Sequence, residues 1–439
     1  MRPEFLKHAR RDLPRYTSYP TAVRFGPEVG AAEAEAWAAA VPAGARTSVY
    51  AHTPFCDQLC WYCGCHTTVP NGYDRVARFV DRIEREADLW AVRLGPHGGA
   101  AHLHFGGGSP NSLSPADFER LAARLRRVFR VRPDAEVAVE LDPRSLDADF
   151  VEALGRAGVT RASLGVQTFD SEVQARVNRI QPFEQVAEAV RGLRAAGVGA
   201  INFDLMYGLP LQTPERVAES ARLAAELRPD RLAVFGYAHV PWFKKHQKMI
   251  REDELADLEG RWAQAEAADA VLTGAGYVRI GLDHYALPDD PLVEAAERGR
   301  LRRNFQGYTT DTAEVLVPLG PSAIGAFPAG FVQNARASDV WARAVDAGVL
   351  AVDRGLVLTD EDRRRAAVIE RVMCDLAADF DPGMEGVRPV LEALAADGLC
   401  TLAEGLVTVA PEARRLVRVV AAAFDAGLAE TAGRHARAI

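Results

Sequence analysis

The sequence lacks any stretch that would cross a membrane as a helix, and it lacks an excess of positive charge. Its longest uncharged run, Val315 to Val332, contains three prolines, which interrupt helices. The segment MRPEFLKHARRDLPRY has no apolar core typical of a signal peptide. The formal net charge of −8 argues against nucleic acid or an anionic membrane as a partner. We therefore expect a cytoplasmic protein that has no membrane span and binds no nucleic acid.

Cysteine is also scarce, but four of the six cysteines lie within ten residues: Cys56, Cys60, Cys63 and Cys65. So uneven a distribution is not a disulfide framework and suits a reducing compartment. The first three form C-x-x-x-C-x-x-C, and three thiolates can hold three irons of a 4Fe–4S cluster while the fourth iron stays open. Cys65 is then not needed to retain the cluster. The alternative is a structural zinc site made by all four, although zinc more often uses two separated C-x-x-C pairs.

Strand-like and helix-like segments alternate from residue 46 onward. Apolar and β-branched stretches predict strands at 47–52, 101–105, 136–141, 161–166, 200–205 and 231–237. Amphipathic stretches predict helices between them, at 73–94, 115–129, 146–157, 182–196 and 214–227. Repeated β/α units indicate a right-handed parallel sheet, and these units are fewer than the roughly eight of a closed barrel. We therefore predict an α/β fold with a partial, TIM-like (β/α)6 barrel.

The chain of 439 residues is long enough for more than one domain. Residues 1–44 show little periodicity, and the prolines of PRYTSYPT at 14–21 favour an extended path, so we predict an N-terminal arm over the active site. Arg15, Tyr16 and Tyr19 could reach the site from such an arm, and the alternative is a tail packed on the surface. Residues 45–350 are predicted to form the catalytic domain, with the core barrel at about 45–260. Helical patterns dominate 351–439, which we predict to be a mainly helical C-terminal domain.

Glycine and polar residues follow the predicted strands, where active sites of barrel folds lie. FGGGS at 105–109 follows the second strand, and its missing Cβ atoms would let a backbone approach a ligand, although glycine runs also make plain turns. Glu140 ends the third strand, where it can accept hydrogen bonds from an ammonium or a ribose, or pair with an arginine. Arg179 and Asp204 follow later strands, and an ordinary ion pair is the alternative for both.

The stretch HTPFCDQLCWYCGC at 52–65, together with PRYTSYPT and RNFQGYTT at 303–310, resembles the oxygen-independent coproporphyrinogen III oxidases of the radical S-adenosylmethionine (SAM) superfamily. The resemblance extends over most of residues 13–325. It implies a radical SAM barrel and a 4Fe–4S cluster on the first three cysteines, with SAM chelated to the open iron. One electron from the cluster would cleave SAM and release a 5′-deoxyadenosyl radical.

The same resemblance implies two SAM molecules in one site. Contacts to the cluster-bound SAM are expected from Tyr50, Gly107, Glu140 and Ile324. Contacts to the second SAM are expected from Tyr62, Gly108, Ser109, Gln167, Arg179, Asp204 and Ala238. Tyr50, Glu140 and Arg179 are the residues expected to act in catalysis. This chain departs from the family pattern mostly in the second set, where Tyr62 replaces phenylalanine and Gly236 replaces asparagine.

The implied reaction converts coproporphyrinogen III to protoporphyrinogen IX in anaerobic haem biosynthesis. Hydrogen abstraction from the β-carbon of a propionate, followed by loss of CO2 and one electron, leaves a vinyl group on each of two propionates. An electron-donor protein is implied as a partner, and we expect a monomer. The substrate carboxylates need cations, and the candidates are Lys244, Lys245, Lys248, Arg251, Arg302 and Arg303.

Two alternatives use the same scaffold. One is a radical SAM methyltransferase or cyclopropanase, in which the second SAM donates carbon. The other is a haem-binding chaperone, whose members resemble the core but usually lack the extra Gly64-Cys65 and the NFQGYTT segment.

Overall fold

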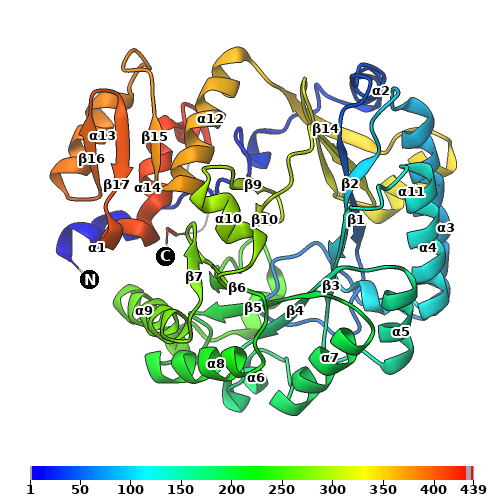
Figure 1. Ribbon diagram of the computed structural model, residues 1–439, viewed down its shortest axis with the longest axis horizontal. Coiled ribbons are helices and arrows are strands. Elements are labelled where there is room, and N and C mark those ends of the chain that lie inside the picture. Colours follow the sequence, from blue (N-terminus) through cyan, green and yellow to red (C-terminus); the bar gives the residue numbers. More distant parts are fainter. Residues whose placement is uncertain (1, 432–436, 439) are drawn as a thin grey trace.

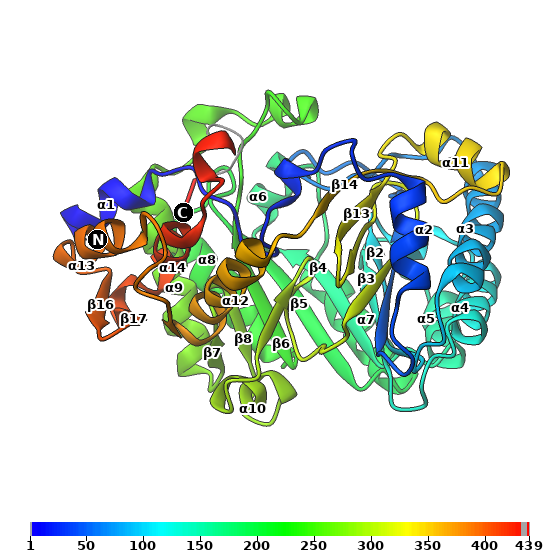
Figure 2. The ribbon, with the colours of Figure 1, turned by 90° about the horizontal axis from the view of Figure 1, so that it is seen from above.

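A computed structural model describes residues 2–431 and 437–438. At its centre, six parallel strands follow one another in chain order (Figure 1): β1 (Thr47–Thr53), β2 (Ala100–Gly107), β3 (Glu136–Leu141), β4 (Arg161–Gln167), β5 (Ala200–Tyr207) and β6 (Arg231–Gly236). The connecting helices cover the outer face of the sheet (Figure 2): α3 (Tyr73–Arg93), α4 (Pro115–Val128), α5 (Ala148–Arg156), α7 (Phe183–Ala195) and α8 (Pro214–Glu226). The short α6 (Ser171–Arg176) instead packs with Trp61 and Tyr62, at the ends of the strands. The predicted partial barrel of β/α units is confirmed.

Local sequence signals explain where these elements begin. The side chains of Ser114, Asp147 and Thr213 accept hydrogen bonds from backbone N–H groups in the first turns of α4, α5 and α8. Such caps satisfy N–H groups that the helix itself cannot pair. The apolar stripe predicted for α3, from Val76 to Trp90, is buried against the sheet. Caps and stripes together place each helix so that the strand ends stay open for the site.

The sheet continues past both ends of the six-strand core without closing. Beside β1 lie β11 (Val315–Leu319), β12 (Ile324–Phe327), β13 (Gly330–Asn334) and β14 (Val352–Val357). Beside β6 lie β8 (His284–Ala286) and then β7 (Val278–Ile280). The same region contains α9 (Leu258–Gly274), α10 (Pro291–Glu297), the β9 (Arg302–Asn304) and β10 (Gly307–Thr309) pair, and α11 (Ser338–Asp346). Because β14 and β7 do not pair with each other, the barrel is open along one side.

The two ends of the chain contain the predicted C-terminal helices and also elements that the sequence pattern did not predict, namely the N-terminal helices and a small C-terminal sheet. The first 44 residues form α1 (Pro3–Ala9) and α2 (Ala31–Ala39), besides the irregular stretch at 14–20. The C-terminal part contains α12 (Asp360–Asp375), α13 (Val387–Ala396) and α14 (Val417–Ala421), and also a small sheet of β15 (Ala377–Asp379), β17 (Leu406–Val409) and β16 (Cys400–Ala403). Across the described residues, no helix is both long and apolar enough to span a bilayer.

The N-terminal arm packs onto the C-terminal part of the chain. Both ribbon views show α1 beside the orange and red elements (Figures 1 and 2). Phe5 and Leu13 belong to the same hydrophobic cluster as the buried faces of α12, α13 and α14. Tyr16 Oη donates to Asp425 Oδ2 at 3.0 Å, and Arg418 Nη1 donates to the carbonyl of Leu13 at 3.2 Å. These contacts fix the path of the arm along the mouth of the barrel near β6.

Candidate active site

The cysteine-rich loop follows the end of β1. Cys60 is buried, Cys56 and Cys63 are half-buried, and Cys65 is exposed. Thr67 Oγ1 donates to Cys56 Sγ at 3.1 Å and so ties the end of the loop to its first cysteine. A hydrogen bond from Cys65 lowers the pKa of Cys63 to about 7, although burial acts in the other direction. Burial instead raises the pKa of Cys56 to about 12, so the sulfurs of the loop differ in how easily they lose a proton.

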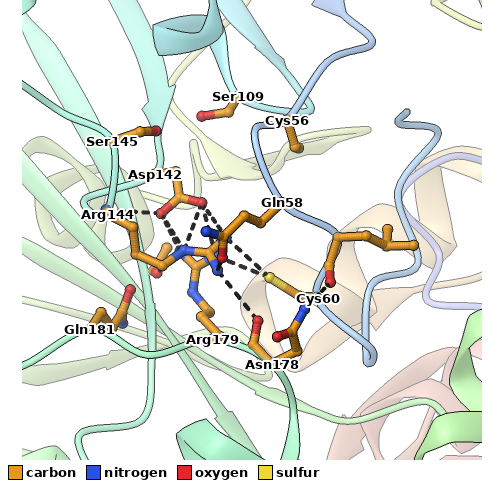
Figure 3. A network of polar contacts seen from close by, with 12 residues as sticks. Cys56, Gln58, Cys60, Ser109, Asp142, Arg144, Ser145, Asn178, Arg179 and Gln181 are labelled. Atoms are coloured by element: carbon orange, nitrogen blue, oxygen red, sulfur yellow. Dashed lines mark hydrogen bonds and ion pairs between the residues drawn. The ribbon is translucent and has the colours of Figure 1, made fainter. Parts of the chain in front are cut away.

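Two largely buried arginines converge on the sulfur of Cys60 (Figure 3). Arg144 Nη2 and Arg179 Nη1 each lie 3.3 Å from Cys60 Sγ. The Asp142 carboxylate holds both guanidinium groups, at 2.6 Å from Arg144 Nη2 and 3.2 Å from each terminal nitrogen of Arg179. Burial acts to raise the pKa of Asp142, but Arg179 and Arg144 outweigh it and leave the pKa lowered. An ionised aspartate thus orients two donors that stabilise negative charge on the sulfur.

The donor set fits an iron–sulfur cluster better than a single metal ion. In residues 2–431 and 437–438, no three His, Cys, Asp or Glu side chains converge as the ligands of one ion must. The structure therefore does not support the zinc alternative. A cubane binds each thiolate at a different iron, so its ligands stand apart, and N–H donors to the sulfurs are a usual part of such sites. Cys56, Cys60 and Cys63 lie on one loop, and their role as the ligands of such a cluster stays a prediction.

The glycine run after β2 packs tightly against the cysteine loop and β1. A Cβ on Gly107 would lie 2.3 Å from His52 Nδ1, and φ at Gly107 is +106°, a region that favours glycine. A Cβ on Gly108 would lie 2.3 Å from the carbonyl oxygen of Phe55. Gly107 N also donates to Glu140 Oε2 at 2.9 Å. The glycines are therefore required for close packing that joins the cysteine loop to the third strand.

Tyr50, His104 and Glu140 form a line of polar side chains across β1, β2 and β3. Tyr50 and His104 are paired in register, with ring centroids 5.6 Å apart, and Tyr50 Oη lies 3.1 Å from His52 Nδ1. His104 Nε2 lies 3.0 Å from Glu140 Oε1. Burial acts to raise the pKa of Glu140, but its hydrogen bonds with His104 and Gly107 leave the pKa lowered. Glu140 is thus an ionised acceptor, and it lines a cavity of about 280 Å³ in the barrel.

The residues predicted for the second SAM do not share one cavity. Asp204 lines the same cavity as Glu140, and burial together with the Glu140 charge raises the pKa of Asp204 to about 6. Ala238 lines a different cavity, of about 460 Å³. Arg179 forms the ion pair with Asp142 that the sequence left open as an alternative. Asp204 instead accepts hydrogen bonds from neutral side chains on β4 and β5.

Two further residues of that set, Ser109 and Tyr62, already have partners within the protein, and a third, Gln167, has an unusual backbone conformation. Ser109 is buried, and its hydroxyl donates to Asn111 Oδ1 at 2.6 Å. Gln167 has φ of +66° at the end of β4, which turns the chain there. Burial raises the pKa of Tyr62 well above its usual value, and Gln247 Nε2 donates to the Tyr62 carbonyl at 2.9 Å. The SAM contacts assigned to these residues stay predictions.

Ile324 lies at the start of β12, after a loop that is fixed by a buried carboxylate on α3. Glu86 Oε2 accepts from Gly320 N at 2.6 Å, and Glu86 Oε1 accepts from Asn334 Nδ2 at 2.6 Å. Burial raises the pKa of Glu86 to about 7, although these hydrogen bonds oppose the shift. Glu86 therefore fixes the loop that precedes Ile324 and the strand paired with it.

The candidate cations for the substrate carboxylates are spread over several environments. Lys244 Nζ donates to the carbonyl of Cys65 at 2.8 Å, and the other two lysines are exposed. Arg251 and Arg302 are paired with nearby carboxylates at 2.6 and 2.8 Å. Arg303 stands over the ring of Tyr308 at 4.3 Å, and two of its nitrogens are buried without hydrogen-bond partners. The structure therefore does not gather these six residues into one anion site.

Sequence reasoning missed several residues that build the site. Asp142 and Arg144 lie two and four residues after Glu140, at the same strand end, so their position alone was a usable signal. Glu86 is a single charge within the apolar stripe of α3, which also marks it as unusual. His104 had no such signal, because its role depends on the pairing of β2 with β1 and β3.

This fold and cysteine loop define a radical SAM enzyme: the model of the Radical SAM superfamily matches residues 50–224. The chain is 48% identical to oxygen-independent coproporphyrinogen III oxidase from Bradyrhizobium diazoefficiens, over 99% of both chains. It is 38% identical to the protein of that name from Escherichia coli K12, over 95% of this chain and 94% of the relative. A solved structure of Escherichia coli coproporphyrinogen III oxidase matches with a TM-score of 0.90 at 36% identity, covering 95% of this chain and 99% of that one. The chain belongs to the family of oxygen-independent coproporphyrinogen III oxidases.

Proposed function

We propose that this chain catalyses the oxidative decarboxylation of two propionate side chains of coproporphyrinogen III, giving protoporphyrinogen IX. The observation that carries the proposal is the match, over 99% of both chains, to a relative named for this activity. In each half of the reaction a propionate loses one hydrogen atom, one CO2 and one electron, and a vinyl group remains. The product step therefore needs an electron acceptor, and the start of the reaction needs a one-electron donor.

The cluster loop supports the cofactor part of this proposal. A 4Fe–4S cluster with SAM supplies, when bound, a carbon-centred radical that can take a hydrogen atom from an unactivated carbon. Cys56, Cys60 and Cys63 would hold the cluster. Arg144 and Arg179, fixed by Asp142, donate toward the Cys60 sulfur and would keep its charge localised there.

The protein groups around the predicted SAM contacts have complementary chemistry. Glu140 is held ionised by His104 and Gly107, so it suits the ammonium or ribose hydroxyls of SAM. Tyr50 is half-buried near it and fixed by His52, so it can pack against the cofactor and exclude water. We place the cluster-bound SAM between these residues and Ile324.

A second SAM molecule is also part of the proposal. Asp204 on β5 lines the same cavity as Glu140, and Ala238, which follows β6, borders the separate cavity of about 460 Å³. We propose that Tyr62, Gln167 and Arg179 close this side of the site around the second molecule. Equilibrium binding of radiolabelled SAM to the reconstituted protein tests the count, and a stoichiometry of one would reject the second site.

The activity itself is tested in an anaerobic assay with reconstituted cluster, SAM, dithionite and coproporphyrinogen III. Both 5′-deoxyadenosine and protoporphyrinogen IX are expected. Release of 5′-deoxyadenosine with no vinyl product would reject the substrate. Transfer of a labelled methyl group from SAM to a product would favour the methyltransferase alternative instead, and stoichiometric haem binding with no SAM cleavage would favour the chaperone.

A further inference from the structure

Arginine side chains converge on the larger cavity, which has a volume of about 460 Å³ and is lined in part by Ala238. The N-terminal arm, the start of α9 and the C-terminal part of the chain supply them: Arg15, Arg261, Arg415, Arg418 and Arg437. Among the residues that the structure describes, three carboxylates line the same cavity, those of Asp12, Glu252 and Asp283. For a protein with a formal net charge of −8, this is a local excess of positive charge.

Two of these guanidinium groups are held side by side at the end of β6. Arg15 Nη2 donates to the carbonyl of Gly236 at 3.1 Å, and Arg261 Nη2 donates to the carbonyl of Tyr237 at 2.8 Å. Arg15 also stands over an aromatic ring of β6 at 5.5 Å, and Arg261 stands over the ring of Tyr207 at 5.7 Å. The carbonyls of two successive residues and two aromatic rings thus hold both guanidinium groups in place before any ligand binds.

The backbone around Arg261 leaves room for a guanidinium. A Cβ on Gly208 would lie 2.4 Å from Arg261 Nη1, and φ there is +79°. A Cβ on Gly236 would lie 3.1 Å from Arg261 Nη2. Gly236 stands where the family pattern has asparagine, so the departure noted in the sequence provides space for this side chain.

Neither Arg15 nor Arg261 forms a salt bridge within the part of the chain that the structure describes, although the charge of Arg15 acts on Asp283 at longer range. No carboxylate oxygen there lies within 4.0 Å of either guanidinium group. Arg261 Nε is buried and has no hydrogen-bond partner. Asp283, which lines the same cavity, is hydrogen-bonded to His284 at 2.8 Å. Arg261 is only partly exposed, and burial together with the neighbouring charges of Arg437 and Arg15 lowers its pKa, so a bound anion would relieve the repulsion at this side chain.

We propose that Arg15 and Arg261 bind a propionate carboxylate of the substrate, one that is not being oxidised. The inference rests on the proposed function, in which the substrate has four carboxylates on the edge of a flexible tetrapyrrole. Arginine is suited to this task because its planar fork donates two hydrogen bonds to one carboxylate. Since Ala238 borders the cavity, an anchored propionate leaves another free to face the predicted SAM site. The N-terminal arm then has a defined role, which is to bring Arg15 to the substrate.

The test uses direct binding rather than turnover. Coproporphyrin III, a fluorescent tetracarboxylate, and its tetramethyl ester are titrated against the reconstituted holoenzyme. The acid is expected to bind and the ester to bind more weakly. Arg15→Gln and Arg261→Gln should each weaken binding of the acid by about tenfold, the usual effect of losing hydrogen bonds between charged groups. Arg261→Lys keeps the charge but loses the paired donors of the guanidinium group, so we expect its affinity for the acid to lie between those of the wild type and Arg261→Gln.

The matched control is Arg343→Gln on α11, an exposed arginine paired with Asp339, which should bind like the wild type. Equal affinity of the acid for wild type and both variants would overturn the assignment, as would equal binding of acid and ester. A parallel loss of SAM cleavage without substrate would also overturn it, because the defect would then lie in the cofactor site. If Arg261→Gln does not fold, Arg15→Gln decides, since Arg15 is exposed.

The two proposals fail in different ways. If the wild type binds the acid but forms no vinyl product, the proposed function fails and the anion site stands. If the wild type forms product and both variants keep its KM and its affinity for coproporphyrin III, the anion site fails and the function stands.

Discussion

Replacing Asp142 with asparagine should destabilise the protein far more than a comparable change on the surface. Asp142 neutralises Arg144 and Arg179, whose side chains are only 10% and 7% exposed. An asparagine at this position would keep the shape of the side chain but leave two largely buried positive charges without an anion. Removing one partner of a buried ion pair typically costs about 3–5 kcal/mol. We therefore expect Asp142→Asn to lower the free energy of unfolding by roughly 3 kcal/mol or more.

Asp346 provides the matched control, because it also binds two arginines, Arg82 and Arg85, but is 39% exposed. Water screens these exposed ion pairs, so Asp346→Asn should lower the free energy of unfolding by about 1 kcal/mol or less. Urea unfolding of the metal-free proteins, followed by tryptophan fluorescence, measures both. If the two variants lost similar, small amounts of unfolding free energy, the reasoning would be refuted. After reconstitution, Asp142→Asn should also retain less iron, because its arginines no longer hold the Cys60 sulfur in place.

Three further predictions concern the cofactor site and its supports. Alanine at any one of the three cluster cysteines should abolish iron binding, whereas Cys65→Ala should retain the cluster. If Cys65→Ala lost its iron, the assignment of one iron without a protein ligand would be wrong. Gly107→Ala should lose SAM binding, because its Cβ would lie 2.3 Å from His52, whereas Gly64→Ala in the cysteine loop, with nothing within 4 Å, should bind SAM normally. Glu86 has a folded pKa of about 7 against an ordinary value of 4.5, so its contribution to stability is present below pH 4.5 and is lost as the pH rises through 7. Urea unfolding between pH 5 and 8 should show that the free energy of unfolding of the wild type falls by roughly 2.5 kcal/mol because of this group. Glu86→Gln should lack that fall, and equal pH profiles for the two proteins would contradict the prediction.

The β/α core was predictable from the sequence because each of its elements has a local signal. Strand β3 was predicted with its observed bounds, and the helices begin at capping residues that read directly from the chain. The ends of the chain were harder. The short strands of the C-terminal sheet, such as β15 of three residues, carry too few side chains to show a period. Their pairing comes from contacts between segments about 30 residues apart, such as Ala377 with Thr408.

The candidate site divides in the same way. The cysteine spacing predicted a cluster loop, and the glycine run and Glu140 were predicted at strand ends. What Arg179 contacts was not predictable, because its partner, Asp142, lies 37 residues away and meets it only after β3 and β4 are paired. The positive cavity was also hidden, since Arg15 and Arg261 come from distant parts of the chain.

The sequence by itself determined the chemistry of this protein: three thiolates at a fixed spacing on one loop, and the order of strands and helices that carries them. Both depend on neighbours in the chain, so spacing alone reveals them. Only the tertiary structure decided which charges meet. Electrostatic partners such as Arg179 with Asp142, and uncompensated neighbours such as Arg15 and Arg261, depend on distance in space, and that distance is set by the packing of the whole sheet and its two ends.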